Sequence, residues 1–181
     1  RGMIKFATKA DLIRFSDEMS VQKRQSLRKR AEERPLAGST FLSHSSSDDE
    51  LVVGAISVLE NHGASVYVDK KDSALPPYTS AETAKILKDR IKQTQRLVLL
   101  ASNNSKDSKW VPWELGVADG FRGLQRIAVF LATDSPSQDS WTRWEYLGLY
   151  DRIIWGDHEN YDGKIWMVMK PDSNTATELR R

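Results

Sequence analysis

The feature that most constrains the fold is a repeated alternation of short, uniformly apolar runs with longer segments of helical periodicity. Residues 39–43, 66–68, 97–101 and 127–131 are such runs, and residues 153–155 are a candidate fifth. Strands that are apolar on both faces belong to parallel sheets that helices cover on both sides. The chain therefore predicts an α/β domain with a central parallel sheet.

The segments between the apolar runs predict helices. Residues 48–62 carry one apolar face and end at Gly63, a residue suited to a helix C-terminus. Thr79 and Glu82 have the spacing of a capping box, which predicts the start of a second helix. Residues 110–121 predict a third helix, with a proline in its first turn.

Residues 1–38 are unusually basic. Thr8 followed by Asp11 is typical of a helix start, and we expect one or two amphipathic helices in this segment. Its closely spaced basic residues are Lys23, Arg24, Arg28, Lys29, Arg30 and Arg34. We favour a solvated helical face that packs on the following domain, and the alternative is weak, salt-sensitive contact with nucleic acid.

The length of 181 residues suits one compact domain, which we place at residues 39–170 with a C-terminal tail at 171–181. Arg1 and Gly2 precede Met3 and are expected to be left from cloning. The chain has no cysteine, which excludes thiol nucleophiles, thiolate zinc sites and disulfides and fits a reducing cytoplasm. A net charge of +2 does not indicate a nucleic-acid binder, and no apolar run approaches the roughly 18 residues of a membrane span.

Several common catalytic signatures are missing. The chain contains no dinucleotide-binding G-x-G-x-x-G, no P-loop and no G-x-S-x-G elbow. Its histidines, His44, His62 and His158, do not have the spacing of metal ligands, so we expect no metal site. These absences disfavour an ATPase, a serine hydrolase and a zinc enzyme.

Polar residues follow three of the predicted strands, at the edge where open parallel sheets bind ligands. They are Ser43, His44 and Ser45 after the first strand, Asp69 after the second, and Ser102 and Asn103 after the third. Taken alone, each residue is more often a loop former or a local hydrogen-bonding residue than a ligand. Together they make this edge the candidate binding site.

Glu114 is the sharpest candidate for chemistry. Helical spacing places four residues on one face: Trp110, Glu114, Val117 and Phe121. A carboxylate on an apolar face is costly unless it is paired, hydrogen-bonded or in a cleft. Glu114 is therefore either a structural group neutralised by Arg122 or Arg126, or a functional carboxylate. Desolvation raises its pKa and the nearby helix N-terminus lowers it, so the net direction stays open.

Three stretches of this sequence resemble the Toll/interleukin-1 receptor (TIR) domain family. Phe41–Asp48 resembles the first-strand motif, and Val66–Asp69 with its proline-containing loop resembles the second strand and the BB loop. Residues 97–102 followed by 108–115 resemble the third strand and the helix that bears the catalytic glutamate of TIR enzymes. The W-V-x-x-E spacing is the most specific part, and the likeness covers about residues 40–155.

The resemblance implies a flavodoxin-like three-layer sandwich with a mostly parallel five-stranded sheet. It also implies a site in which NAD is the substrate, with no cofactor, and Glu114 is catalytic. Implied substrate-binding residues are Ser43, His44, Ser45, Asp69, Ser102 and Trp110, and implied BB-loop contacts between copies are Pro76, Pro77 and Tyr78. The serine-rich segment after the first strand lacks the arginine of many relatives, so phosphate contacts are not carried over there.

The chain also resembles stand-alone bacterial TIR proteins, including the signal-producing component of Thoeris anti-phage systems. This resemblance implies that it cleaves the nicotinamide–ribose bond of NAD. The product is then ADP-ribose, a cyclic isomer or a conjugate, which acts on a separate effector. Two alternatives remain: a TIR interaction module without catalysis, and another glutamate-dependent N-glycosidic enzyme such as a nucleoside deoxyribosyltransferase. The product isomer, the trigger and the oligomeric state stay open.

Overall fold

The computed structural model describes residues 6–70, 81–105, 110–135, 148–171 and 175–179. The helices are α1 (Lys9–Asp17), α2 (Val21–Glu32), α3 (Val52–Asn61), α4 (Ala81–Gln93) and α5 (Trp110–Arg122), with short 3-10 helices at Ser46–Leu51 and Leu124–Arg126. The strands are β1 (Ala7–Thr8), β2 (Thr40–Ser43), β3 (Val66–Tyr67), β4 (Arg96–Ser102), β5 (Ile127–Thr133), β6 (Asp151–Asp157), β7 (Lys164–Met169) and β8 (Ala176–Glu178).

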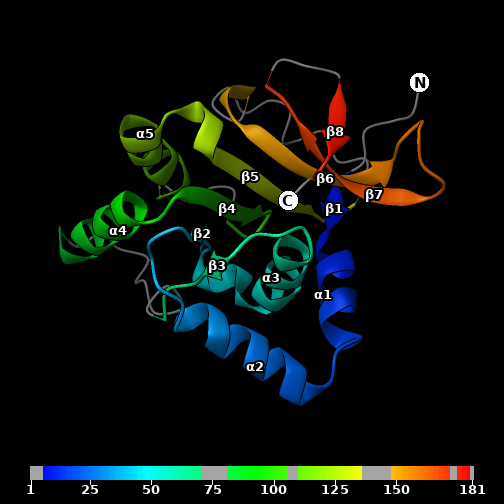
Figure 1. The fold of residues 1–181 in the computed structure, drawn as a ribbon, viewed down its shortest axis with the longest axis horizontal. Coiled ribbons are helices and arrows are strands. Elements are labelled where there is room, and N and C mark those ends of the chain that lie inside the picture. The colour runs from blue at the N-terminus through cyan, green and yellow to red at the C-terminus, as the bar shows by residue number, and fades with distance from the viewer. Residues whose placement is uncertain (1–5, 71–80, 106–109, 136–147, 172–174, 180–181) are drawn as a thin grey trace.

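One sheet runs through the molecule in the order β3-β2-β4-β5-β6-β7-β8 (Figure 1). The five strands from β3 to β6 are parallel, as the apolar runs predict. The described sheet also contains three strands that the sequence did not predict. β7 and β8 extend it in antiparallel fashion beyond β6, and the short β1 pairs in parallel with the carboxyl end of β5.

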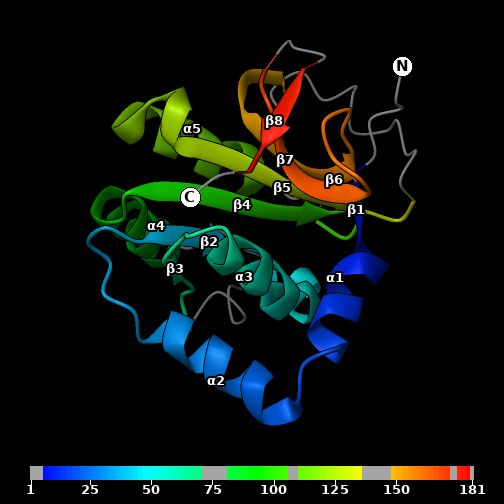
Figure 2. The ribbon, with the colours of Figure 1, turned by 45° about the vertical axis from the view of Figure 1, so that its right-hand side comes forward.

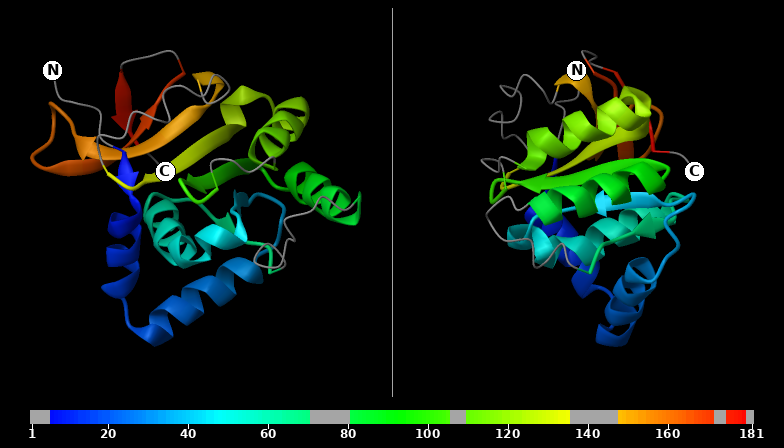
Figure 3. Two further views of the ribbon diagram at one scale, coloured as in Figure 1. Left: turned by 180° about the vertical axis from the view of Figure 1, so that it is seen from behind. Right: turned by 90° about the vertical axis from the view of Figure 1, so that its left-hand side faces the viewer.

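Helices cover both faces of the sheet, so the α/β class with three layers is confirmed. Along β4, Leu97 and Leu99 belong to the cluster of buried residues that includes α4 and α5, whereas Val98 and Leu100 belong to the cluster that includes α1 and α3. This alternation explains why the central strands are apolar at every position: each has two faces to bury. In the views of Figures 2 and 3, α2 lies outermost, beyond α3.

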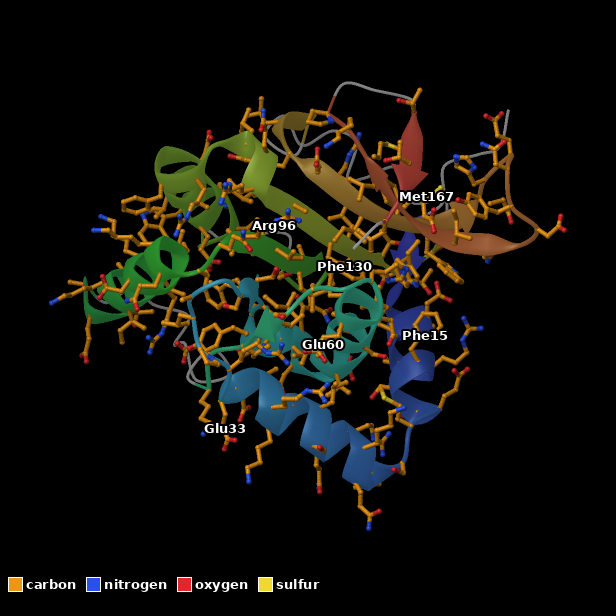
Figure 4. The ribbon with its side chains drawn as sticks, in the orientation of Figure 1. Phe15, Glu33, Glu60, Arg96, Phe130 and Met167 are labelled. Carbon is orange, nitrogen blue, oxygen red and sulfur yellow. The ribbon has the colours of Figure 1, made fainter. Side chains whose placement is uncertain are left out.

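One or two N-terminal helices were expected, and the structure has two, α1 and α2, which pack on the domain that follows. The Thr8 side chain accepts a hydrogen bond from Asp11 N at 3.1 Å, and the Asp11 carboxylate accepts one from Thr8 N at 3.0 Å, so the expected cap of α1 is a complete capping box. α1 packs against α3. Glu60 of α3 lies between α3 and α2 (Figure 4) and pairs with Arg30 at 2.5 Å and Arg34 at 2.8 Å.

The helix predicted over residues 48–62 differs from the structure at its start. Ser46–Leu51 forms a 3-10 helix, and α3 begins only at Val52. Asp48 is fully buried in this first turn, which places its carboxylate among polar partners near the end of β2. The capping box expected at Thr79 and the BB-loop residues Pro76, Pro77 and Tyr78 lie outside the described residues.

Candidate active site

Glu114 lies on the buried face of α5 and meets the end of β2. Its side chain is 4% exposed, and it accepts a short hydrogen bond from Ser43 Oγ. The buried residues of the helix are Val111, Glu114, Leu115 and Ala118. The predicted face is therefore rotated: Phe121 is 48% exposed, and the Trp110 side chain lies outside the described part of the structure.

Burial raises the pKa of Glu114 to about 7, and the hydrogen bond from Ser43 offsets only part of this rise. Glu114 comes after the first turn of α5, which begins at Trp110. The field of a helix N-terminus fades within that turn. Desolvation therefore outweighs the helix N-terminus, and the net shift in the pKa of Glu114 is upward.

The arginines offered as structural partners of Glu114 lie elsewhere, so the prediction of a neutralising ion pair is wrong. Arg122 Nη2 donates to the carbonyl of Lys92. Arg126 lines a cavity at the start of the parallel strands, the edge of the sheet opposite to Ser43. A buried carboxylate whose described hydrogen-bond donor is a neutral hydroxyl can change its protonation state near neutral pH.

A second carboxylate, Asp48, gathers two of the predicted hydroxyls. Ser102 Oγ donates a short hydrogen bond to Asp48 Oδ1, and Ser45 Oγ lies 3.4 Å from Asp48 Oδ2. Ser102 Oγ also accepts a hydrogen bond from Asn104 N at 3.0 Å. Sequence reasoning missed Asp48 as a site residue. The three-residue spacing from Ser45 was the available signal, but it is also the ordinary pattern of a helix start.

Asp69 is buried after β3 and is held by neighbours on its own side of the site. Arg90 Nε donates to Asp69 Oδ2 at 2.9 Å, and the Tyr67 hydroxyl donates to the same oxygen at 3.1 Å. Arg90, on α4, is a second residue that sequence reasoning missed. The ion pair fixes the Asp69 carboxylate beside the carboxyl end of β3.

The family model described as "TIR domain" matches residues 40–162. The chain belongs to the TIR domain family. Among its relatives is a protein of Bacillus cereus (strain MSX-D12) described as "Probable 3' cyclic ADP-D-ribose synthase ThsB'". It is 41% identical over 130 residues, which are 70% of this chain and 66% of the relative.

A second relative, from Cytobacillus dafuensis, is described as "Putative cyclic ADP-D-ribose synthase TIR2". It is 27% identical over 113 residues, or 61% of this chain. The chain spans somewhat less than two thirds of the first relative's length, and the match covers 27% of the second relative.

In this TIR domain, His44 connects the end of β2 to the N-terminal helices. Its side chain is fully buried, and Nε2 lies 3.5 Å from Asp49 Oδ1, at the outer limit of a hydrogen bond. Arg28 of α2 donates to both Asp49 oxygens, at 2.7 and 3.2 Å. His44 and Arg28 together hold the pKa of Asp49 well below its usual range. A helix that precedes the matched residues thus contacts the segment that carries Ser43.

The TIR domain places the predicted polar residues at one edge of its sheet but in separate contacts. Ser43 meets Glu114, Ser45 and Ser102 meet Asp48, and Asp69 meets Arg90. Among the described residues, no helix is both long and apolar enough to cross a membrane.

Proposed function

We propose that this TIR domain cleaves the bond between nicotinamide and ribose in NAD and closes the remaining ADP-ribose into a cyclic product. The observation that carries the proposal is the buried Glu114 carboxylate, held by Ser43 at the ligand-binding edge of the sheet. The names of both relatives, which describe cyclic ADP-ribose synthases, support the same chemistry.

Glu114 supplies charge rather than a proton. As the glycosidic bond breaks, its electron pair leaves with nicotinamide, which departs as a neutral molecule and needs no general acid. The ribose C1 becomes cationic, and a nearby carboxylate stabilises that charge in the transition state. A hydroxyl or ring nitrogen of the same molecule then bonds to C1 and the product sheds one proton, or water bonds instead and gives ADP-ribose.

The burial of Glu114 suits this role because NAD carries its positive charge on the nicotinamide ring. With a pKa of about 7, the free carboxyl is partly protonated at neutral pH. A cation bound beside it favours the ionised form. Ser43 engages Oε2 and so fixes the orientation of the carboxyl group. Ser43 is in this view a positioning residue, and Glu114 is the catalytic one.

The decisive experiment incubates the purified chain with NAD and follows nicotinamide and ribosyl products by chromatography and mass spectrometry, with and without lysate of phage-infected cells. We expect nicotinamide and a product isobaric with cyclic ADP-ribose. Glu114→Gln keeps the side-chain volume and removes the charge, so nicotinamide release should fall at least about a hundredfold.

Glu33→Gln is the matched control, because it removes the same charge from an exposed residue at the C-terminal end of α2 (Figure 4). It should retain wild-type turnover. Full turnover in Glu114→Gln would overturn the role of this carboxylate. No nicotinamide release under any condition would favour an interaction module without catalysis.

We further propose that the cyclic product acts on a separate effector in anti-phage defence, and that the chain works in the cytoplasm. The resemblance to Thoeris proteins supports the role in defence, and the first relative's name supports the cyclic product. The absence of cysteine is compatible with the cytoplasm. Self-association through Pro76, Pro77 and Tyr78 belongs to the same proposal, and its test is given below.

A further inference from the structure

A cavity of about 300 Å³ opens at the amino-terminal edge of the sheet, opposite the Ser43–Glu114 pair. Its apolar wall includes Leu59, Leu97, Ile127, Ile153 and Leu179, and its polar wall includes Gln95, Arg96, Gln125 and Arg126. This volume is at the lower end of the range for small-molecule sites, which combine an apolar wall with a few polar groups.

The two arginines occupy equivalent places on neighbouring strands. The dipeptide Gln-Arg stands at 95–96, where β4 begins, and again at 125–126, directly before β5. Leu97 pairs with Ile127 in parallel register, so the residues before them, Arg96 and Arg126, enter the cavity wall side by side. Figure 4 marks Arg96 at the start of β4, where the residue is exposed.

These guanidinium groups have no acidic partner among the residues that the structure describes. The one acidic residue in the described wall, Asp151, pairs with Lys170 at 2.7 Å and is neutralised by it. Two like charges side by side repel each other, and an anion between them removes that repulsion. The planar fork of arginine matches the oxygens of a phosphate.

We propose that this cavity binds a small phosphorylated ligand of mononucleotide size or less, with Arg96 and Arg126 on the phosphate and the apolar wall against the rest. The amides of Gln95 and Gln125 add hydrogen-bond donors beside the guanidiniums. The cavity lies at the edge of the sheet opposite to Glu114, so the inference stands whether or not the domain cleaves NAD.

The test is calorimetric titration of the purified chain at low ionic strength with adenosine monophosphate, inorganic phosphate and adenosine. We expect saturable binding of adenosine monophosphate and weaker binding of phosphate, with adenosine weakest. In the double variant Arg96→Ala/Arg126→Ala, affinity for adenosine monophosphate should fall at least about tenfold, as the loss of charge-assisted hydrogen bonds implies. Arg126→Lys keeps the charge without the fork and should give an intermediate loss.

The charge-matched control is Lys29→Ala/Lys88→Ala, at exposed positions outside this cavity, which should bind as the wild type does. Unchanged affinity in the arginine variant would place the nucleotide elsewhere, for example near Glu114, and overturn the proposal. An equal loss of affinity in the lysine control would show that the nucleotide is held only by nonspecific electrostatic attraction. This result would also overturn the proposal. If the double variant has a lower melting temperature than the wild type, the same titrations are made with the single variants Arg126→Ala and Arg126→Lys. Arg126 is exposed, so these variants should fold normally.

Discussion

Glu114 is buried at the cost of stability, because its ionised form loses water without gaining a cation. Its pKa is about 7 in the folded domain, against an ordinary value of 4.5. The folded state therefore binds the proton more tightly than the unfolded state does. This contribution favours folding below about pH 4.5 and is lost as pH rises to about 7.

Glu114→Gln should therefore stabilise the domain at alkaline pH. The shift corresponds to about 3 kcal/mol at pH 8, an upper value that water entry reduces. The measurement is the difference in free energy of unfolding between variant and wild type, from urea titrations at pH 5, 6, 7 and 8. The difference should grow with pH for Glu114→Gln, whereas for Glu33→Gln it should not change with pH. A variant that is less stable than the wild type at pH 8 would instead make Glu114 a structural carboxylate.

Single residues were predictable from sequence where periodicity alone exposes an anomaly. Glu114 stood out because a carboxylate interrupts an apolar helix. Its partner Ser43 was placed at the correct edge, but the contact between them depends on how α5 is rotated. Asp48 could not be told from a surface residue, because only tertiary packing shows that a 3-10 turn buries it against Ser102.

At the scale of elements, one glycine sets how closely two helices approach. A Cβ built on Gly54 of α3 would overlap the carbonyl oxygen of Leu12 in α1 and lie 3.2 Å from its Cα. Backbone cannot move aside as a flexible side chain can. Gly54→Ala should therefore destabilise the domain by about 1–3 kcal/mol, the range for overpacking.

Gly120→Ala on α5 is the matched control, because a Cβ there meets nothing within 4 Å. The same substitution at this open helical site should be neutral or stabilise by up to about 1 kcal/mol. Thermal melts of both variants decide the matter. Equal melting temperatures for the two would show that α1 does not lie against α3 in solution.

The contact of α2 with Asp49 and His44 gives a second prediction at this scale. Arg28→Ala removes the two hydrogen bonds that hold Asp49 beside His44. We expect nicotinamide release to fall several-fold, with a loss of about 1 kcal/mol in stability. Arg24→Ala, one helical turn earlier, removes only an ion pair with the exposed Asp17 and should leave both quantities unchanged. Equal activity of the two variants would confine Arg28 to a structural role.

The parallel strands were predictable because burial on both faces leaves an unmistakable apolar run. β7 was missed although residues 165–169 are also an apolar run. Its burial is less complete than that of the central strands, since Lys164 is exposed and Ile165 and Val168 are half-buried. β1 is two residues long, and no local pattern can announce a strand of that length. These two residues form a strand only because they pair with Ala132 and Thr133 of β5.

At the scale of the whole molecule, self-association should show in the kinetics. If a neighbouring copy completes the NAD site, nicotinamide release per mole of chain should rise with protein concentration. Tyr78→Ala should depress this rise while leaving the melting temperature unchanged. Activity assays over a wide dilution series, paired with light scattering, provide the measurement. Constant specific activity from a monomer would contradict the assembly.

The pairing of β1 with β5 implies that one part of the sheet can form only late in folding. Thr133 Oγ1 donates to the carbonyl of Ala7 across 126 residues, and both residues of β1 take their strand partners from the same place. During synthesis β1 leaves the ribosome before β5, so β1 must wait until β5 has emerged. Joining such distant segments is slow because loop closure costs entropy. The earlier strand is thus fixed late, and a nascent chain that ends before β5 lacks the partner that holds β1.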